Sequence, residues 1–269
     1  GMYHIPLALR VVRDKSSAAL DAAKLRSCFL EIFRRHEVLR TTYHMDDAQG
    51  ILEQRVNAMG SVEKLFELEE VSMALDPARP DHLGEEMSLY IQKPFDVSKD
   101  VMVRVRVMNV VSGGGSSETV LLMVAHHLAF DGWSVNILKN ELDSLYSSKP
   151  LPPPPSVQYL DFSVFEQSSK SLMKEGLDFW KQHLDGCESF VLDLPLDRPR
   201  GGTRTGVGAS VDCTLPPDVV RGLMSWSKAN YCTLYMVLLG CYKLLLHKVC
   251  RQTDICVGSV NANRYRSEL

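Results

Sequence analysis

Two adjacent histidines, His126 and His127, are the residues whose type and setting indicate chemistry. They follow an apolar, strand-like segment at 119–125, and Asp131 and Gly132 come after them, just before a helical pattern begins. An imidazole at the end of a buried strand is held by packing and can still reach a cleft. Its unperturbed pKa of about 6.5 suits a general base. The segment predicts a proton-accepting site, with His127, nearer the turn, as the base and His126 packed beneath it.

The same segment also fits a role without chemistry. Histidines at a strand end can be satisfied core or edge residues, and Asp-Gly is a common pair in turns. The two histidines alone do not decide between a catalytic and a structural role, so the decision rests on the rest of the chain.

Several predicted elements would position the histidines. Segment 3–12 has a strand pattern, and 101–108 alternates valines with other residues, which predicts a half-exposed strand. The Gly/Ser run at 112–117 joins that strand to the histidine strand as a hairpin. A phosphate cradle is the alternative, but no Lys-Ser/Thr and helix follow the run. Helices are predicted after Asp21, which is a plausible N-cap, and over 81–92.

A charged cluster lies where the first helix gives way to a strand at 41–43. Arg35 near the helix C-terminus complements the helix dipole. Arg40 lies in the turn into the strand, where that explanation is weaker. Residues 46–80 are polar and show no strong period.

Proline-rich residues 149–156 predict a stiff, extended linker, the best internal boundary signal. A docking site for a proline-recognising module is the alternative. Beyond the linker the patterns predict, in order, helices from 157 and over 172–184, a loop at 194–202, a strand at 207–215, a helix opening at Pro217, a long buried helix capped by Thr233, and a final strand at 254–260.

Composition limits the class of protein. The 269 residues are natural for two lobes, and 45% hydrophobic residues can form a core. A net charge of -3 gives no reason to expect nucleic acid or a membrane surface. The seven cysteines are odd in number and form no Cys-x-x-Cys pair, so we expect reduced, mostly buried thiols in a cytoplasmic protein without zinc. No secretory signal is seen, and the apolar segment 234–246 is too short to span a bilayer.

Three motifs occur together and in one order. Residues 126–132 resemble His-His-x-x-x-Asp-Gly, residues 35–43 resemble Arg-His-x-x-Leu-Arg-Thr, and residues 159–165 resemble Tyr-x-Asp-Phe. Segments 194–199 and 254–264 are similar to later segments of the same family. As an ordered set, they give the chain its resemblance to the condensation domains of nonribosomal peptide synthetases.

The resemblance implies an α/β fold, layered as an α+β sandwich. A chloramphenicol-acetyltransferase-like lobe at 1–170 would carry the histidine motif, and 171–269 would begin a second, similar lobe. The family's first motif and its later Gly-x-Phe-Val-Asn-Thr segment have no match here. We therefore expect a piece of a condensation domain, whose activity in isolation is in doubt.

The resemblance also implies a reaction, in which two acyl groups held as thioesters on phosphopantetheine arms are joined as an amide. The partners would be donor and acceptor carrier (thiolation) domains and a neighbouring adenylation domain, with no cofactor bound directly.

The resemblance further assigns roles to individual residues. His127 would accept the proton of the attacking amine or orient it. Asp131 would pair with Arg264, although Arg264 could instead be an exposed charge at a strand end. Gly132 would permit the tight turn, and its N–H could face the oxyanion. Arg35 and Arg40 would support the site.

Epimerisation domains of the same superfamily share the double histidine, whereas heterocyclisation domains replace it with paired aspartates, which this chain does not have. Residues 131–134 resemble ordinary peptide-bond-forming members. A non-catalytic module that only docks carriers is one alternative function, and an acyltransferase that uses coenzyme A is another.

Overall fold

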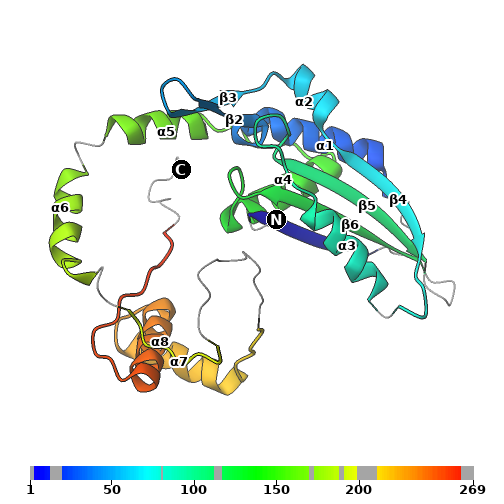
Figure 1. Ribbon diagram of the computed structural model, residues 1–269. Coiled ribbons are helices and arrows are strands. Elements are labelled where there is room, and N and C mark those ends of the chain that lie inside the picture. The colour runs from blue at the N-terminus through cyan, green and yellow to red at the C-terminus, as the bar shows by residue number, and fades with distance from the viewer. Residues whose placement is uncertain are drawn as a thin grey trace. The chain divides into compact units, whose positions relative to one another are not determined.

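The computed structural model describes residues 3–12, 20–79, 81–111, 117–169, 173–187, 191–198 and 211–261 (Figure 1). The chain divides into two compact units, which separate after Ser168. The first unit is a mixed α/β structure built on a four-stranded sheet, whereas the regular structure described in the second consists of helices.

The strand that carries the histidines, β6 (Ser117–His126), lies inside a sheet of order β1-β6-β5-β4. It pairs antiparallel with β1 (His4–Val11) and with β5 (Val103–Val111). The edge strand β4 (Leu68–Ala74) runs parallel to β5. The predicted strands at both β1 and β5 are confirmed, as is the hairpin pairing of β5 with β6. The glycine-rich residues between them, 112–116, lie outside the described residues.

Both faces of β5 and β6 are covered. Every residue of β6 from Val120 to Ala125 is buried, and so are most residues of β5. The prediction of a half-exposed strand at 101–108 is therefore wrong. The alternating valines do face one core, but helices cover the opposite face as well, so the intervening side chains are buried too, except Arg106, which is half-buried.

Helices α1 (Ala22–Arg35) and α4 (Gly132–Tyr146) cover one face of the sheet (Figure 1). The carboxylate of Asp21 accepts the N–H of Lys24 at 2.9 Å, which confirms the predicted N-cap. The apolar side of α1 enters the larger core of this unit at helical spacing, as predicted, through Leu25, Phe29, Ile32 and Phe33.

Helix α3 (His82–Gln92) covers the other face, at the predicted position, and ends before Lys93-Pro94. The buried cation Arg104, only 4% exposed, reaches from β5 under the end of α3. Its guanidinium donates to the carbonyl oxygens of Tyr90 at 3.1 Å and Pro94 at 3.3 Å, and also to that of Lys93. The same group lies 4.1 Å from the centroid of the Phe95 ring, so carbonyl dipoles and a π face solvate it. Burial accordingly lowers the pKa of Arg104.

A second, two-stranded sheet joins β2 (Thr41–Asp46) to β3 (Ile51–Val56), and helix α2 (Met59–Leu65) follows it. The strand predicted at 41–43 is confirmed. The sequence predicts no element in β3, α2 or β4, because these segments have no strong period. Strand β4 obtains its conformation from pairing with β5 along its whole length, which is a tertiary effect.

The proline-rich segment has no regular structure, as predicted, and leads into α5 (Tyr159–Ser168). It is not a free spacer, however. Arg35 donates to the carbonyl oxygens of Pro152 at 2.9 Å and Pro153 at 3.4 Å. Gln158 donates to the carbonyl oxygen of Arg35 at 3.0 Å and accepts the N–H of Glu37 at 3.1 Å. The segment is therefore fastened to the end of α1.

The second unit contains α6 (Lys174–His183), α7 (Pro217–Ala229) and α8 (Leu234–Cys250). The predicted starts of the last two helices are confirmed, since Pro217 opens α7 and the Thr233 hydroxyl accepts the N–H of Met236 at 3.2 Å. The part of the predicted strand at 207–215 that the structure describes, 211–215, has no regular structure.

Three expectations for this region are wrong. Residues 254–260 form no strand, because among the described residues of this unit no strand is available to share a ladder. Helix α8 is not buried, because only Val237 and Leu246 are removed from solvent. The cysteines are free but not mostly buried, since Cys28 is buried while three others are exposed.

Within the described residues, no single helix is long and apolar enough to cross a membrane. Helices α7 and α8 taken together are long and apolar enough, but the chain bends by 110° between them.

Candidate active site

The two histidines occupy a tight turn, residues 126–129, called here the histidine turn. The N–H of Ala129 donates to the carbonyl oxygen of His126 at 3.0 Å, so the chain reverses as soon as β6 ends. The His127 side chain is exposed, whereas that of His126 is half-buried. Adjacent side chains leave a strand on opposite sides, so the packing that holds one histidine presents the other to solvent.

The main chain of His127 is fixed by the residue that precedes β1. Its N–H donates to the carbonyl oxygen of Tyr3 at 2.8 Å, just beyond the paired residues His4 and His126. An exposed imidazole on an immobilised main chain can exchange a proton with a bound molecule without reorganising the sheet.

His126 is held from several directions. Its N–H donates to the carbonyl oxygen of Met102 at 2.9 Å, and its Nδ1 accepts the N–H of Leu128 at 3.2 Å. Burial lowers the pKa of His126, and the neighbouring His4 and His127 lower it further. The neutral imidazole is therefore favoured, in the tautomer that leaves Nδ1 free to accept.

Asp131 caps the helix that follows the histidine turn. Its carboxylate accepts the N–H of Ser134 at 2.8 Å and the Ser134 hydroxyl at 2.6 Å, while the Asp131 N–H donates back to that hydroxyl at 3.3 Å. This reciprocal cap fixes the angle at which α4 leaves the histidine turn.

The tight turn expected to require Gly132 is not what the structure shows. Gly132 is the first residue of α4, is not among the residues with positive φ, and a Cβ there would meet no atom within 4 Å. The expectation is wrong because the capping box of Asp131, rather than glycine geometry, starts the helix.

A buried carboxylate that the sequence did not single out, Glu141 on α4, joins α4 to the end of α1. It accepts from Arg35 Nε at 3.1 Å and from His36 Nε2 at 2.8 Å, and the Arg35 and Glu141 side chains are only 8% and 11% exposed. Burial raises the pKa of Glu141, but the hydrogen bonds and charges of His36 and Arg35 outweigh it and leave that pKa below its usual value. The helix-dipole explanation for Arg35 is thus incomplete.

Arg40 holds the other side of the same motif. From the short helix η1 (Glu37–Arg40), its guanidinium donates to the carbonyl oxygens of Phe33 at 3.2 Å and Asn57 at 2.6 Å and to the Glu37 carboxylate at 3.0 Å. These bonds connect α1, η1 and the end of β3, so Arg40 has structural partners and does not reach the histidine turn through any of them.

Tyr43 provides the direct connection from this region to the histidine turn. From β2, its hydroxyl donates to the carbonyl oxygen of Leu128 at 3.3 Å, and burial raises its pKa to about 12. No sequence signal identified Tyr43 or Glu141, because each is defined by a partner far along the chain. The structure thus brings together His126, His127, Asp131 and Gly132, and links Arg35 to them through α4. Arg264 lies outside the described residues.

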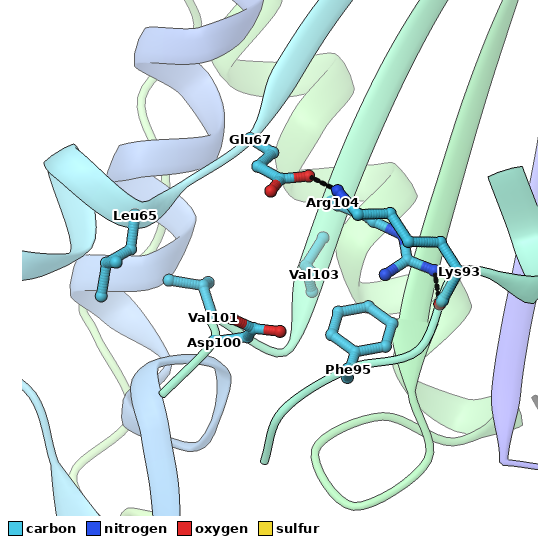
Figure 2. A pocket seen from close by; sticks show the side chains of 8 residues that line it. All are labelled: Leu65, Glu67, Lys93, Phe95, Asp100, Val101, Val103 and Arg104. Atoms are coloured by element: carbon cyan, nitrogen blue, oxygen red, sulfur yellow. Dashed lines mark hydrogen bonds and ion pairs between the residues drawn. The ribbon is translucent and has the colours of Figure 1, made fainter. Parts of the chain in front are cut away.

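One hollow in the first unit is too small for a substrate. It is lined by Leu65, Glu67, Lys93, Phe95, Asp100, Val101, Val103 and Arg104 (Figure 2). Its volume of about 30 Å³ admits one or two water molecules. Lys93 and Glu67 pair across it at 2.7 Å, and Arg104 Nε, which lies in this region, has no partner among the described residues. Within the described residues no group of three or more His, Cys, Asp or Glu could hold a metal ion.

The arrangement defines a class of protein: an α/β domain whose central strand ends in an adjacent pair of histidines, one packed and one exposed, directly before a capped helix. The chain matches the Condensation domain family over residues 3–269, and it belongs to that family.

Known relatives agree with this assignment. The chain is 34% identical over 275 residues to phosphinothricin tripeptide synthetase PhsB of Streptomyces viridochromogenes, a match that covers 99% of the chain and 22% of that synthetase. It is 32% identical over 271 residues to bacitracin synthase 3 of Bacillus licheniformis, covering 99% of the chain and 4% of the synthase. The chain thus spans a small part of the length of these relatives.

Solved structures share the fold. SgcC5 from Streptomyces globisporus superimposes with a TM-score of 0.69 at 23% identity, over 99% of this chain and 58% of SgcC5. The four-domain nonribosomal peptide synthetase holo-AB3403 gives a TM-score of 0.70 at 21% identity, over 93% of this chain and 18% of that chain. The predicted family and the α/β fold are confirmed.

We predict that Glu141→Gln destabilises the first unit by about 3–5 kcal/mol, because it leaves the buried Arg35 without its counter-charge. The free energy of unfolding, measured by urea denaturation, checks this. The matched control is Glu53→Gln, which removes an exposed pair with Arg55 at 2.8 Å and should cost no more than about 1 kcal/mol. Equal losses in the two variants would show that the Glu141 cluster has no special role.

The same carboxylate predicts an acid-sensitive stability. The pKa of Glu141 is lower in the folded than in the unfolded chain, where it is about 4.3, so the folded state binds fewer protons. Its contribution is complete above that unfolded value and is lost as the pH falls through the folded pKa. Unfolding measured between pH 6 and pH 3 should therefore show a shallower fall for Glu141→Gln than for the natural chain. Parallel curves would contradict the argument.

Proposed function

We propose that this chain is the histidine-bearing part of a peptide-bond-forming condensation domain, acting on acyl groups tethered to carrier proteins. The observation that carries the proposal is the exposed imidazole of His127 on a main chain fixed by Tyr3, beside a packed His126 whose Nδ1 accepts the N–H of Leu128. Family membership and the synthetase relatives support the class of reaction.

The proposed step forms one bond and breaks another. The α-amine of the acceptor attacks the carbonyl carbon of the donor thioester and an N–C bond forms. The C–S bond breaks with its electron pair on sulfur, which takes up the proton lost by the nitrogen and leaves as the phosphopantetheine thiol. The ammonium form has no lone pair, so a proton must leave the nitrogen before or during attack, and His127 accepts it or orients the amine. A positioned base typically contributes about 10²–10⁴-fold, and holding two tethered substrates together supplies much of the remainder.

The partners proposed are a donor and an acceptor carrier domain, with an adenylation domain in the same synthetase. The phosphopantetheine arms belong to the carriers, and the reaction as written needs no cofactor held by this chain. We further propose that residues from about 171 onward begin the second lobe of the condensation domain.

We predict that His127→Ala in the complete domain, with both carriers loaded, slows amide formation by about 10²–10⁴-fold. Carrier-bound product would be followed by mass spectrometry under single-turnover conditions. His183→Ala, which removes an exposed imidazole on α6, is the matched control and should retain its rate.

The same assay separates the alternatives. Undiminished product from His127→Ala would remove His127 from the mechanism. The absence of product from the natural domain with authentic loaded carriers would favour a module that only docks carriers. Transfer from free acyl-coenzyme A without a carrier would favour a coenzyme A-dependent acyltransferase.

We also propose that Arg264 pairs with the carboxylate of Asp131 and so steadies the histidine turn. Asparagine caps a helix about as well as aspartate, so Asp131→Asn removes the charge and spares the bond from Ser134. We predict that Asp131→Asn and Arg264→Gln are non-additive in rate of amide formation, with a coupling above about 0.5 kcal/mol in a double-mutant cycle. Additive effects would disprove the pairing.

A further inference from the structure

Three rings meet beneath the histidine turn, and one of them, His4, has no role in the mechanism above. The ring centroids of His4 and Phe95 are 5.1 Å apart, those of Phe95 and His126 are 5.8 Å apart, and those of His4 and His126 are 5.9 Å apart. Each pair meets edge to face, at interplanar angles of 86°, 82° and 63°. The three rings, called here the ring trio, thus fix one another in orientation as well as in position.

His4 is anchored to the helix that covers this face of the sheet. Its Nδ1 lies 2.6 Å from the carbonyl oxygen of Ile91 in α3. A carbonyl oxygen only accepts, so the proton is on Nδ1 and the tautomer of His4 is set. Burial lowers the pKa of His4 and the charge of Arg104 lowers it further, although the bond to Ile91 raises it, so the neutral ring is favoured.

The His126 ring has to remain neutral for the turn to keep its shape. Its Nδ1 accepts the N–H of Leu128, and protonation would put a hydrogen on Nδ1 that points at the Leu128 N–H. His4 faces His126 directly across the β1–β6 ladder, in the register that pairs these two residues. A neutral, anchored ring at position 4 therefore packs against His126 without competing for the Leu128 N–H.

The residue just before β1 also fixes the exposed histidine. The carbonyl oxygen of Tyr3 accepts the His127 N–H at 2.8 Å, and the Tyr3 ring lies 6.5 Å from that of His126. Tyr3, just before β1, and His4, its first residue, thus hold consecutive residues of the histidine turn, Tyr3 through the main chain and His4 through its ring.

We propose that His4 is a positioning residue of the condensation site: its ring, anchored to Ile91 and packed with Phe95, sets the plane of the His126 ring. In that plane Nδ1 of His126 keeps the N–H of Leu128, which fixes the tautomer of His126 and the place of His127. The expected effect of His4 on the rate of amide formation rests on the proposed function, whereas its expected effect on the His126 ring does not. His4 touches no substrate in this scheme and acts only through its two neighbours.

The test reads the tautomer of His126 directly. Long-range ¹H–¹⁵N spectra of the complete domain labelled with ¹⁵N-histidine distinguish a protonated from an unprotonated ring nitrogen, and His126→Gln assigns the signal. We expect natural His126 to be protonated on Nε2 alone, and His4→Ala to give averaged tautomers. His4→Phe, which keeps an aromatic ring in the trio, should restore the single tautomer. His183→Ala is the control and should leave the His126 signals unchanged.

The kinetic arm uses the loaded-carrier assay. His4→Ala should lower kcat by about tenfold to a hundredfold with little change in KM, because a displaced base still allows the substrates to bind. His4→Phe should recover most of that loss. If His4→Ala does not fold, His4→Leu fills the space without a ring and should give the same change in spectrum and rate.

Each result decides the proposal. Unchanged His126 signals in His4→Ala or His4→Leu would overturn it, whatever the activity. Changed signals without a loss of rate in an active domain would show that His4 shapes the turn but does not position the base, and would also overturn it. If the natural domain forms no amide, the proposed function fails, whereas the spectra still report on the ring trio.

Discussion

The alternation of side chains along β6 is the constraint on which the site depends. With apolar residues packed on both faces of the sheet, the strand cannot rotate or slip without moving a whole row of buried side chains. Its last residue, His126, is therefore committed to the face under α3, and His127 emerges on the turn. The arrangement of one packed and one exposed imidazole follows from strand geometry rather than from any property of histidine itself.

The helix after the turn is held as firmly as the strand before it. Asp131 fixes the start of α4 through Ser134, and Glu141 ties the middle of α4 to Arg35 and His36 at the end of α1. A buried ion pair is weak evidence for net stability, but removing one partner is costly, so such a pair specifies which helices pack together. The Arg-His motif and the His-His motif, separated along the sequence, are thus parts of one structure.

The sequence predicts this structure well where the signal is local. The N-cap at Asp21, the hydrophobic face of α1, the ends of α3 and the starts of α7 and α8 all follow from residues within a few positions of one another. The histidine pair, too, was recognisable from its immediate neighbours, and the ordered motifs gave the family.

What the sequence could not predict was decided by distant partners. Strand β4 has little pattern of its own and forms by pairing with β5, whereas 254–260 has a strand pattern but no described partner and forms no strand. Burial of Arg104 could not be foreseen from alternating residues, because α3 supplies the carbonyl groups that solvate it. Glu141, Tyr43 and His4 were missed for the same reason: each matters through a residue on another element.

The bonds from Arg35 to the proline carbonyls have a mechanical consequence. Proline has no N–H, so the carbonyl oxygen is the main-chain hydrogen-bonding group of a proline-rich segment. The Arg35 guanidinium donates to two of these oxygens, and the Gln158 side chain donates to the carbonyl oxygen of Arg35. Residues 154–157 are consequently a short loop whose two ends are hydrogen-bonded to the same residue, Arg35. A displacement of α5 would therefore act first on these hydrogen bonds at the end of α1.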